Sequence, residues 1–312
     1  MSHEIETMFS VREKPWHYEM TKDRTKIIQE APTAKEAIIA AGLDWRIEGK
    51  PVFDEKGRAI PGYRANERST DKSILGIVGS RYSVVQNEDA FSFLDGLTKE
   101  QLRYETAGSL RGGKQIWLLG RMPDCEIAGD KVEPYICFTN SHDGMGSVRC
   151  CMTPVRVVCN NTLNYAFRGA PRSWAAPHRG DIGSKMREAR ETLGLAVNYL
   201  ELLDTMACTM ADSHMTEGEM RDALDKMLPV DEGIGEYRKK NIEQTKESIM
   251  VCTLAPDLVK FANSKWQFLN AVADYVGHSK PLRKTQYWKE NRWASIITGN
   301  ALMDSALRAV AA

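Results

Sequence analysis

The strongest constraint on the fold is a change of residue pattern near Gly180. Between residues 43 and 160, short runs rich in β-branched and aromatic residues alternate with turn residues, as in antiparallel sheets. After Ser184, apolar residues recur at helical spacing instead. Strands followed by helices predict an α+β fold, with a largely antiparallel sheet and one or two flanking helices before a helical half. We therefore expect a sheet region at 1–180 and a mainly helical region at 181–312, packed on the first.

Helix boundaries are indicated by capping residues. Thr33 with Glu36, and Thr216 with Glu219, have the spacing of capping boxes, and Gly42 is placed to end the first of these helices. The predicted helices cover residues 33–41, 87–97, 186–210, 216–227, 237–252, 257–276 and 300–310.

The strand signals are strongest around two turns, at 111–114 and 142–146. The predicted strands cover residues 45–53, 60–65, 73–78, 82–86, 103–110, 115–121, 132–140 and 147–152. The first 30 or so residues have no clear period, and we expect them to form an irregular arm.

Cysteine content and hydropathy indicate a reducing cytoplasm. The seven cysteines include no CxxC pair, so neither a disulfide framework nor a standard zinc site is expected. The N-terminus lacks a signal-peptide apolar stretch, and no run of about 18 apolar residues is present to span a membrane. We expect a cytoplasmic protein with no membrane partner, no metal and no cofactor.

A local concentration of positive charge is the main functional signal. Lys plus Arg equals Asp plus Glu, at 42 each, so net charge alone indicates no polyanionic partner. Between residues 144 and 187, however, seven basic residues accompany a single acidic one, Asp181. Aromatic residues and His178 lie among them. A second basic and aromatic cluster occupies residues 280–293.

Arginine guanidinium groups hold phosphates, exposed aromatic rings stack on unpaired bases, and asparagine amides contact sugar or base edges. The candidate nucleic-acid-binding residues are Arg149, Arg156, Asn160, Asn161, Tyr165, Phe167, Arg168, Arg172, Trp174 and Arg179. A solvated or salt-bridged structural face is the competing interpretation, because Arg149 and Arg156 also have the alternation of strand positions, and Trp174 is a typical core residue.

Catalytic signals are weaker. His142 and Asp143 are a common acid–base pair, but neighbours on an extended chain point to opposite faces, and Asp-Gly is a common turn. Cys159 before Asn160 has the position of a nucleophile at a strand end, although no nearby histidine is evident as its base. The sequence therefore favours a binding protein over an enzyme.

Several stretches are recognisable together and in order. They are residues 77–87, 106–117, 141–144, 153–163 and 266–278, of which Thr-Pro-Val-Arg-Val-Val-Cys-Asn-Asn-Thr-Leu at 153–163 is the most specific. Over nearly the whole chain, from about Met8, the sequence resembles the phage/plasmid-like proteins, a family classed as a domain of unknown function.

The resemblance implies a mobile-element origin and a cytoplasmic setting, and it assigns no reaction and no catalytic residue. The strand-rich half with its basic junction is also broadly similar to single-strand annealing proteins. The favoured function is thus nucleic-acid binding, preferably of single strands, in recombination or replication. Two alternatives stay open: a counter-defence protein that binds a host effector, and an enzyme acting on a nucleotide or nucleic acid. A homo-oligomer is also left open.

Overall fold

The computed structural model describes residues 5–11, 23, 25–29, 33–98, 102–156, 173–194, 196–231, 233–279 and 300–311. Its architecture is α+β, as the sequence pattern predicts. The chain divides into two compact units. Unit 1 comprises residues 1–123, 135–152 and 173–195, and unit 2 comprises residues 124–134, 153–172 and 196–312.

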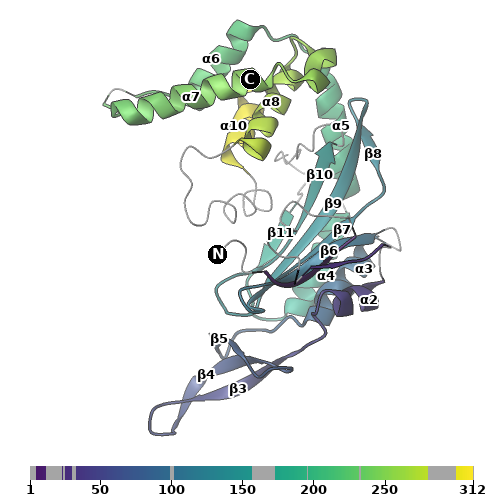
Figure 1. Cartoon of the computed structure of the whole chain (residues 1–312), viewed down its shortest axis with the longest axis vertical. Coiled ribbons are helices and arrows are strands. Elements are labelled where there is room, and N and C mark those ends of the chain that lie inside the picture. The colour runs from purple at the N-terminus through teal and green to yellow at the C-terminus, as the bar shows by residue number, and fades with distance from the viewer. Residues whose placement is uncertain are drawn as a thin grey trace. The chain divides into compact units, whose positions relative to one another are not determined.

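The main sheet has eight strands in the order β11-β10-β9-β7-β6-β1-β2, with β8 paired to β9 (Figure 1). They are β1 (Ile5–Ser10), β2 (Thr25–Ile27), β6 (Arg103–Leu110), β7 (Gln115–Arg121), β8 (Cys125–Ile127), β9 (Asp130–Ser141), β10 (Val148–Arg156) and β11 (Ser173–Ala176). β1 and β2 run parallel, while β6 is antiparallel to both β1 and β7. The predicted turns at 111–114 and 142–146 connect β6 to β7 and β9 to β10.

The expectation of an irregular N-terminal arm is wrong for residues 5–10, which form β1. This strand lies between β2 and β6, and its Phe9 is fully buried in the core. Its partner β6 begins almost 100 residues later, at Arg103. Pairing and burial at that separation in sequence determine the strand, whereas local periodicity does not reveal it.

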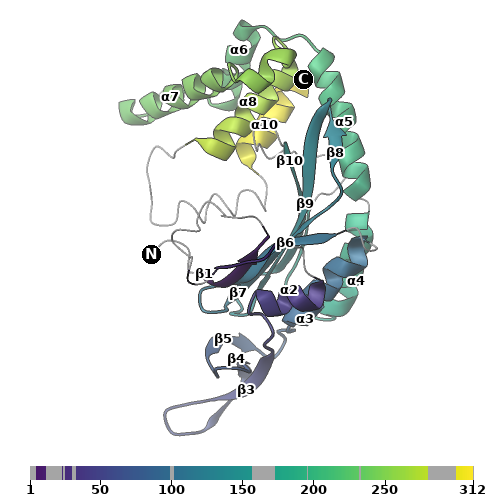
Figure 2. The ribbon, with the colours of Figure 1, turned by 45° about the vertical axis from the view of Figure 1, so that its right-hand side comes forward.

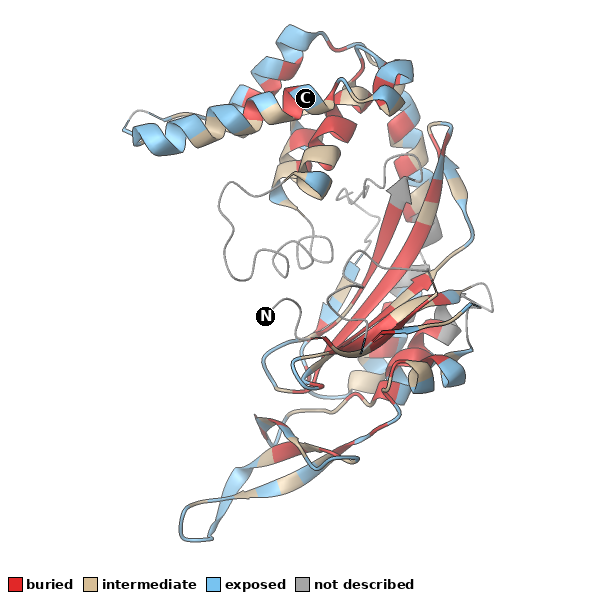
Figure 3. Ribbon diagram, in the orientation of Figure 1, coloured by how far each residue is buried: buried red, intermediate tan, exposed pale blue. Residues whose placement is uncertain are grey.

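A second, three-stranded antiparallel sheet corrects the expectation of one continuous sheet over 43–160. It contains β3 (Ile47–Phe53), β4 (Ala59–Arg68) and β5 (Ile74–Gly79), in that order. Much of β3 and β4 is exposed, whereas the central strands of the main sheet are largely buried (Figure 3). The predicted strand at 82–86 is not formed. Of that segment, Tyr82 alone makes an isolated bridge, to Arg179.

Three helices cover one face of the main sheet (Figure 2). They are α2 (Ala34–Ala40), α3 (Asn87–Thr98) and α4 (Ile182–Gly194). The capping box of Thr33 and Glu36 is present at the start of α2, as predicted. Phe91 of α3 and Phe138 of β9 belong to the same buried cluster. This core fixes β9 and α3, and with them the segments that form the site described below.

Unit 2 is mainly helical. Its helices are α5 (Ala196–Asp212), α6 (Glu217–Met227), α7 (Glu236–Cys252), the 3-10 helix η1 (Pro256–Phe261), α8 (Lys265–His278) and α10 (Ala301–Ala311). The capping box of Thr216 and Glu219 is present at α6. Two predicted helices are each divided in two. The helix expected at 186–210 spans α4 and α5, and that at 257–276 spans η1 and α8, which begins after the capping residue Ser264.

Candidate functional site

Much of the predicted binding segment lies outside the described residues. This holds for Cys159, Asn160, Asn161, Tyr165, Phe167, Arg168 and Arg172, and for the whole basic cluster at 280–293. Arg156 ends β10, and its side chain is outside the description as well. The described candidates are therefore Arg149, Trp174, Arg179, His142 and Asp143.

Arg149 and Trp174 lie on neighbouring strands and face opposite sides of the sheet. Arg149 is paired with Ala175, and the next pair along is Cys150 with Trp174. Because successive side chains alternate across a strand, the arginine and the indole diverge. Trp174 is partly buried and packs against the main core. The Arg149 side chain donates a hydrogen bond from Nε to Ser147 Oγ, at 3.0 Å.

His142 and Asp143 make different contacts in the β9–β10 turn. His142 is fully buried, with its ring edge-on to Trp45 at 5.5 Å. Asp143 accepts hydrogen bonds from Ser141 Oγ and from the backbone N–H of Met145. The turn also packs tightly on β5, since a Cβ built on Gly76 would lie 2.6 Å from Asp143 Cα. These contacts hold the turn in place.

The protonation state of His142 follows from its partners. Asn87 Nδ2 donates to the carbonyl oxygens of Leu43 and Trp45, so its Oδ1 is the acceptor for His142 Nε2, at 3.1 Å. The proton is therefore on Nε2, and Nδ1 is a buried acceptor with no partner among the described residues. Burial lowers the pKa of His142 to about 3, so the ring is neutral at pH 7.

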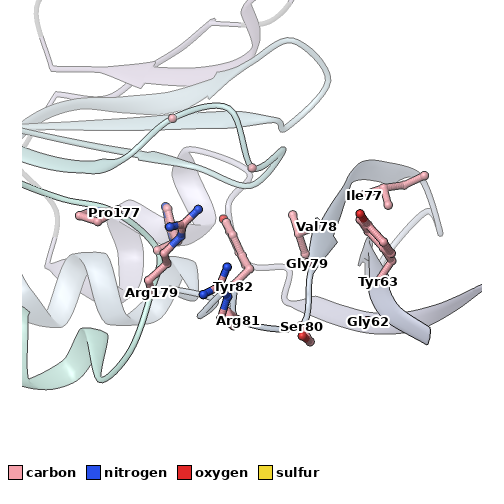
Figure 4. Close-up of a pocket in the computed structure, with 13 residues that line it drawn as sticks. Gly62, Tyr63, Ile77, Val78, Gly79, Ser80, Arg81, Tyr82, Pro177 and Arg179 are labelled. Carbon is pink, nitrogen blue, oxygen red and sulfur yellow. The ribbon is translucent and has the colours of Figure 1, made fainter. Parts of the chain in front are cut away.

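A pocket of about 500 Å³ lies in unit 1, beside the end of the three-stranded sheet (Figure 4). We call it the arginine pocket. It is lined by residues 62–63, 77–82, 144, 146 and 177–179. Arg81, Tyr82 and Arg179 are grouped on one side of it, with Tyr63 and Ile77 on the other (Figure 4). Its size is in the range of pockets that bind small molecules.

Hydrogen bonds join the two segments that carry the arginines. Ser83 donates its backbone N–H to the His178 carbonyl at 3.0 Å, and its Oγ to the Gly180 carbonyl at 2.7 Å. His178 Nδ1 lies 2.9 Å from the Ser83 carbonyl. Tyr82 and Arg179 form a bridge between the same segments. The wall of the pocket is thus a cross-linked pair of segments whose geometry is set before any ligand arrives.

An aromatic stack forms part of this wall. The rings of Tyr82 and His178 lie 4.5 Å apart, with 13° between their planes. The Tyr82 hydroxyl donates to the Ser141 carbonyl at 2.6 Å, and burial raises the pKa of this hydroxyl. Arg64 donates to the Tyr82 carbonyl. Tyr82 is therefore anchored at its ring, its hydroxyl and its backbone.

Arg81 and Arg179 are the available cations of the pocket. Both residues are exposed. Within the ranges that the structure describes, neither guanidinium pairs with a carboxylate. Arg58, by contrast, donates from Nε to Asp54 Oδ2 at 2.7 Å, and Arg46 pairs with Glu88 at 2.8 Å. Two unpaired guanidinium groups beside one hollow are free to hold an anion.

Sequence reasoning named Arg179 but missed Arg81, Tyr63 and Tyr82. Residues 82–86 have the composition of a strand and were predicted as one, whereas they belong to a loop that brings Arg81 close to Arg179. The available signal was the stretch at 77–87, which is among those that carry the family resemblance. Arg149 and Trp174, which were grouped with Arg179 in the sequence, do not line the pocket.

Two further properties concern the described part of the chain only. There, no three His, Cys, Asp or Glu side chains converge in a group that could hold a metal ion. None of its helices is long and apolar enough to cross a bilayer.

Comparison with known proteins identifies a family and no individual relative. No curated protein and no solved structure has significant similarity to the chain. A family profile described as a domain of unknown function (DUF932) matches residues 74–296, which include β5, the Ser80–Tyr82 loop and the whole turn at 142–146. Because this match covers more than half of the chain, the protein belongs to the family described as a domain of unknown function (DUF932).

Proposed function

We propose that the protein binds single-stranded nucleic acid, and that the arginine pocket is one of its contact points. The observation that carries this proposal is the pair of exposed guanidinium groups of Arg81 and Arg179, which have no carboxylate partner among the described residues and border the same hollow. Some other exposed arginines, such as Arg58, are neutralised locally. A functional anion site is a better account of this pair than a solvated face.

Phosphate is the anion that this arrangement suits. An arginine fork forms two parallel hydrogen bonds to phosphate oxygens, and two forks side by side follow a phosphodiester backbone. Tyr63 is 58% exposed, and Ile77 beside it is 59% exposed. A flat exposed ring across the pocket from phosphate-binding groups provides a stacking surface for a base.

The preference for single strands follows from access to the bases. A base enters a pocket or stacks on a protein ring only when it is unpaired, whereas a duplex presents phosphates and base edges in grooves. A hollow of about 500 Å³ with a ring at its rim accommodates an unpaired nucleotide, and none of its described lining residues belongs to a helix that could enter a groove.

The biological setting is part of the proposal. Resemblance to phage/plasmid-like proteins supports a role in recombination or replication of a mobile element. Cys137, Cys150 and Cys151 are buried and take part in no disulfide bond among the described residues, which supports a reducing, cytoplasmic environment. No catalytic step is assigned, because the buried and neutral His142 has no access to a substrate.

The test is equilibrium binding of labelled oligonucleotides to the full chain at low salt. Fluorescence anisotropy with single-stranded DNA, single-stranded RNA and the matching duplex compares the three ligands directly. We expect saturable binding that is tighter for a single strand than for the duplex. Undetectable binding of all three, or a preference for the duplex, would refute the proposal.

A further inference from the structure

We infer that Gly79 is the floor of a slot in the arginine pocket that takes one nucleobase, with the base stacked against Tyr63. This inference deepens the proposed function and rests on it. The base belongs either to one nucleotide of a strand or to a free nucleotide, since both present the same ring beside a phosphate. The new element is the residue that makes room for the base.

Nothing in the described part of the fold requires a glycine at position 79. Its φ lies outside the left-handed region. A Cβ built on Gly79 would have one neighbour within 4 Å among the described residues, the Gly62 carbonyl oxygen at 3.9 Å. The Gly79 carbonyl accepts from the Tyr82 backbone N–H at 3.0 Å, so Gly79 is the first residue of a tight turn. That position accepts most residue types.

Other strand glycines are required by their packing. A Cβ on Gly76, in the same strand as Gly79, would lie 2.6 Å from the backbone of Asp143, and one on Gly108 would lie 2.4 Å from the Thr7 carbonyl oxygen. A glycine weakens a strand, because it has more backbone freedom to lose and no side chain to pack. Since packing does not account for Gly79, the space above it points to a ligand that approaches the backbone closely.

This open space borders the exposed ring of Tyr63. Gly79 is the cross-strand partner of Tyr63, so the tyrosine side chain and the bare side of Gly79 share one face of the sheet. The Cβ positions of such partners are roughly 5 Å apart, and stacked aromatic rings have centroids about 4.5–7 Å apart. A planar ring that stands over Gly79 is therefore at stacking distance from Tyr63. The tyrosine does not fill the space itself, since none of its atoms lies within 4 Å of the Gly79 Cβ position.

The phosphate-binding side of the pocket begins in the same turn. Arg81 follows Gly79 by two residues, and Gly79 lies between Tyr63 and Arg81 in Figure 4. Gly62 is a second exposed glycine of the floor, and a Cβ there would have no described neighbour within 4 Å. All four residues line the arginine pocket. A nucleotide joins its base to its phosphate through a single sugar, which suits a stacking ring and a guanidinium on either side of one bare floor.

The experiment measures binding of a labelled thymidine decamer and an abasic strand of the same length to the full chain by fluorescence anisotropy. Both strands have the same phosphates, and only the first has bases. The key variant is Gly79→Val, which fills the slot and keeps Tyr63 and both arginines. Gly235→Val is the matched control, because Gly235 of unit 2 also has no neighbour within 4 Å of its Cβ position in the described ranges, and its φ is −62°.

We expect the thymidine strand to bind wild type more tightly than the abasic strand does. Gly79→Val should weaken binding of the thymidine strand about five- to hundredfold, the range for one stacked base, and leave binding of the abasic strand unchanged. Gly235→Val should have no effect on either strand. Equal affinity of wild type and Gly79→Val for the thymidine strand, or an equal loss for both strands, would overturn the inference.

The thermal midpoint of Gly79→Val tests the premise that the fold does not need this glycine. It should equal or exceed that of wild type, since valine favours strands and its Cβ meets no close neighbour among the described residues. A clear decrease, or failure of the variant to fold, would overturn the inference. On the unaltered protein, equal affinity for the thymidine and abasic strands would overturn it as well.

A free nucleotide separates this inference from the proposed function. Adenosine monophosphate and ribose 5-phosphate are titrated into wild type and Gly79→Val by isothermal titration calorimetry. If strands bind and Gly79→Val keeps full affinity for them, the inference is wrong and the proposed function stands. If no strand binds, but the nucleotide binds more tightly than ribose 5-phosphate and Gly79→Val removes this difference, the slot takes free nucleotides and the proposed function is wrong. If neither strand nor nucleotide binds, both are wrong.

Discussion

His142 Nε2 donates a hydrogen bond to Asn87 Oδ1 at 3.1 Å, and this contact joins the β9–β10 turn to the first residue of α3. The backbone carbonyl of His142 in turn accepts from Asn66 Nδ2 of β4, at 2.8 Å. One buried histidine therefore connects the main sheet, a covering helix and the three-stranded sheet. Its charge state should govern how well these elements stay together.

The stability of unit 1 should fall in acid because of His142. Its folded pKa of about 3 lies below the ordinary value of 6.5, so its contribution is complete above pH 6.5 and decreases as the pH falls toward 3. The decrease is about 1.4 kcal/mol for each pH unit in that window. His142→Gln keeps a donor for Asn87 and removes the titration. In urea unfolding from pH 7.5 to 4.5, the free energy of unfolding of the variant should rise relative to that of the wild type as the pH falls. Parallel pH profiles would contradict this prediction.

The ion pair of Glu6 and Arg68 should stabilise the attachment of β1. The two guanidinium nitrogens of Arg68 each lie 2.6 Å from a Glu6 oxygen, and the Arg68 side chain is only 8% exposed. The pKa of Glu6 is lowered, mainly by this hydrogen bonding. Glu6→Gln should lower the free energy of unfolding by about 1–3 kcal/mol, because it leaves a buried guanidinium without its main counter-charge.

The control for this pair is Glu88→Gln, which breaks the exposed pair of Arg46 and Glu88. Exposed ion pairs contribute little, so a decrease below about 0.5 kcal/mol is expected. Decreases of the same size for Glu6→Gln and Glu88→Gln in chemical denaturation would show that burial of the Arg68 pair has no energetic consequence.

Close packing between β5 and the β9–β10 turn should make Gly76 intolerant of a side chain. A Cβ at this position would lie 2.6 Å from both Cα and O of Asp143, which are backbone atoms that cannot turn aside. Gly76→Ala should cost about 1–3 kcal/mol of unfolding free energy. Gly79→Ala on the same strand is the control, since its nearest neighbour would be 3.9 Å away. Equal thermal stabilities of the two variants would argue against this packing.

Features set by neighbouring residues were predictable from the sequence. The capping boxes of Thr33 with Glu36 and of Thr216 with Glu219 depend on residues three positions apart, and both are present. The turn at 111–114 is another local feature, with positive φ at Arg111, Gly112 and Gly113. The α+β class follows from such local patterns, summed along the chain.

Features that depend on distant pairing were not predictable. β1 is a strand because it pairs with β6 and packs into the core, although residues 5–10 show no clear alternation. The arginine pocket is a stronger case, since Ser83 and Gly180 are 97 positions apart and their hydrogen bond helps to join the segments of Arg81 and Arg179. A scan for local charge finds Arg179 within a basic run, but it gives no reason to choose Arg81.

The salt dependence of single-strand binding tests the central claim most directly. Removing one arginine that holds a phosphate should reduce the slope of log affinity against log salt by about 0.7 for a single strand. If each arginine holds one phosphate, the double variant Arg81→Ala/Arg179→Ala should bind more weakly. The magnitude of its slope of log affinity against log salt should be lower by about 1.4. Arg58→Ala, which removes an exposed but paired arginine, should leave the slope unchanged. A double variant with the slope of the wild type, or an equal reduction by Arg58→Ala, would contradict the assignment of the arginine pocket to nucleic acid.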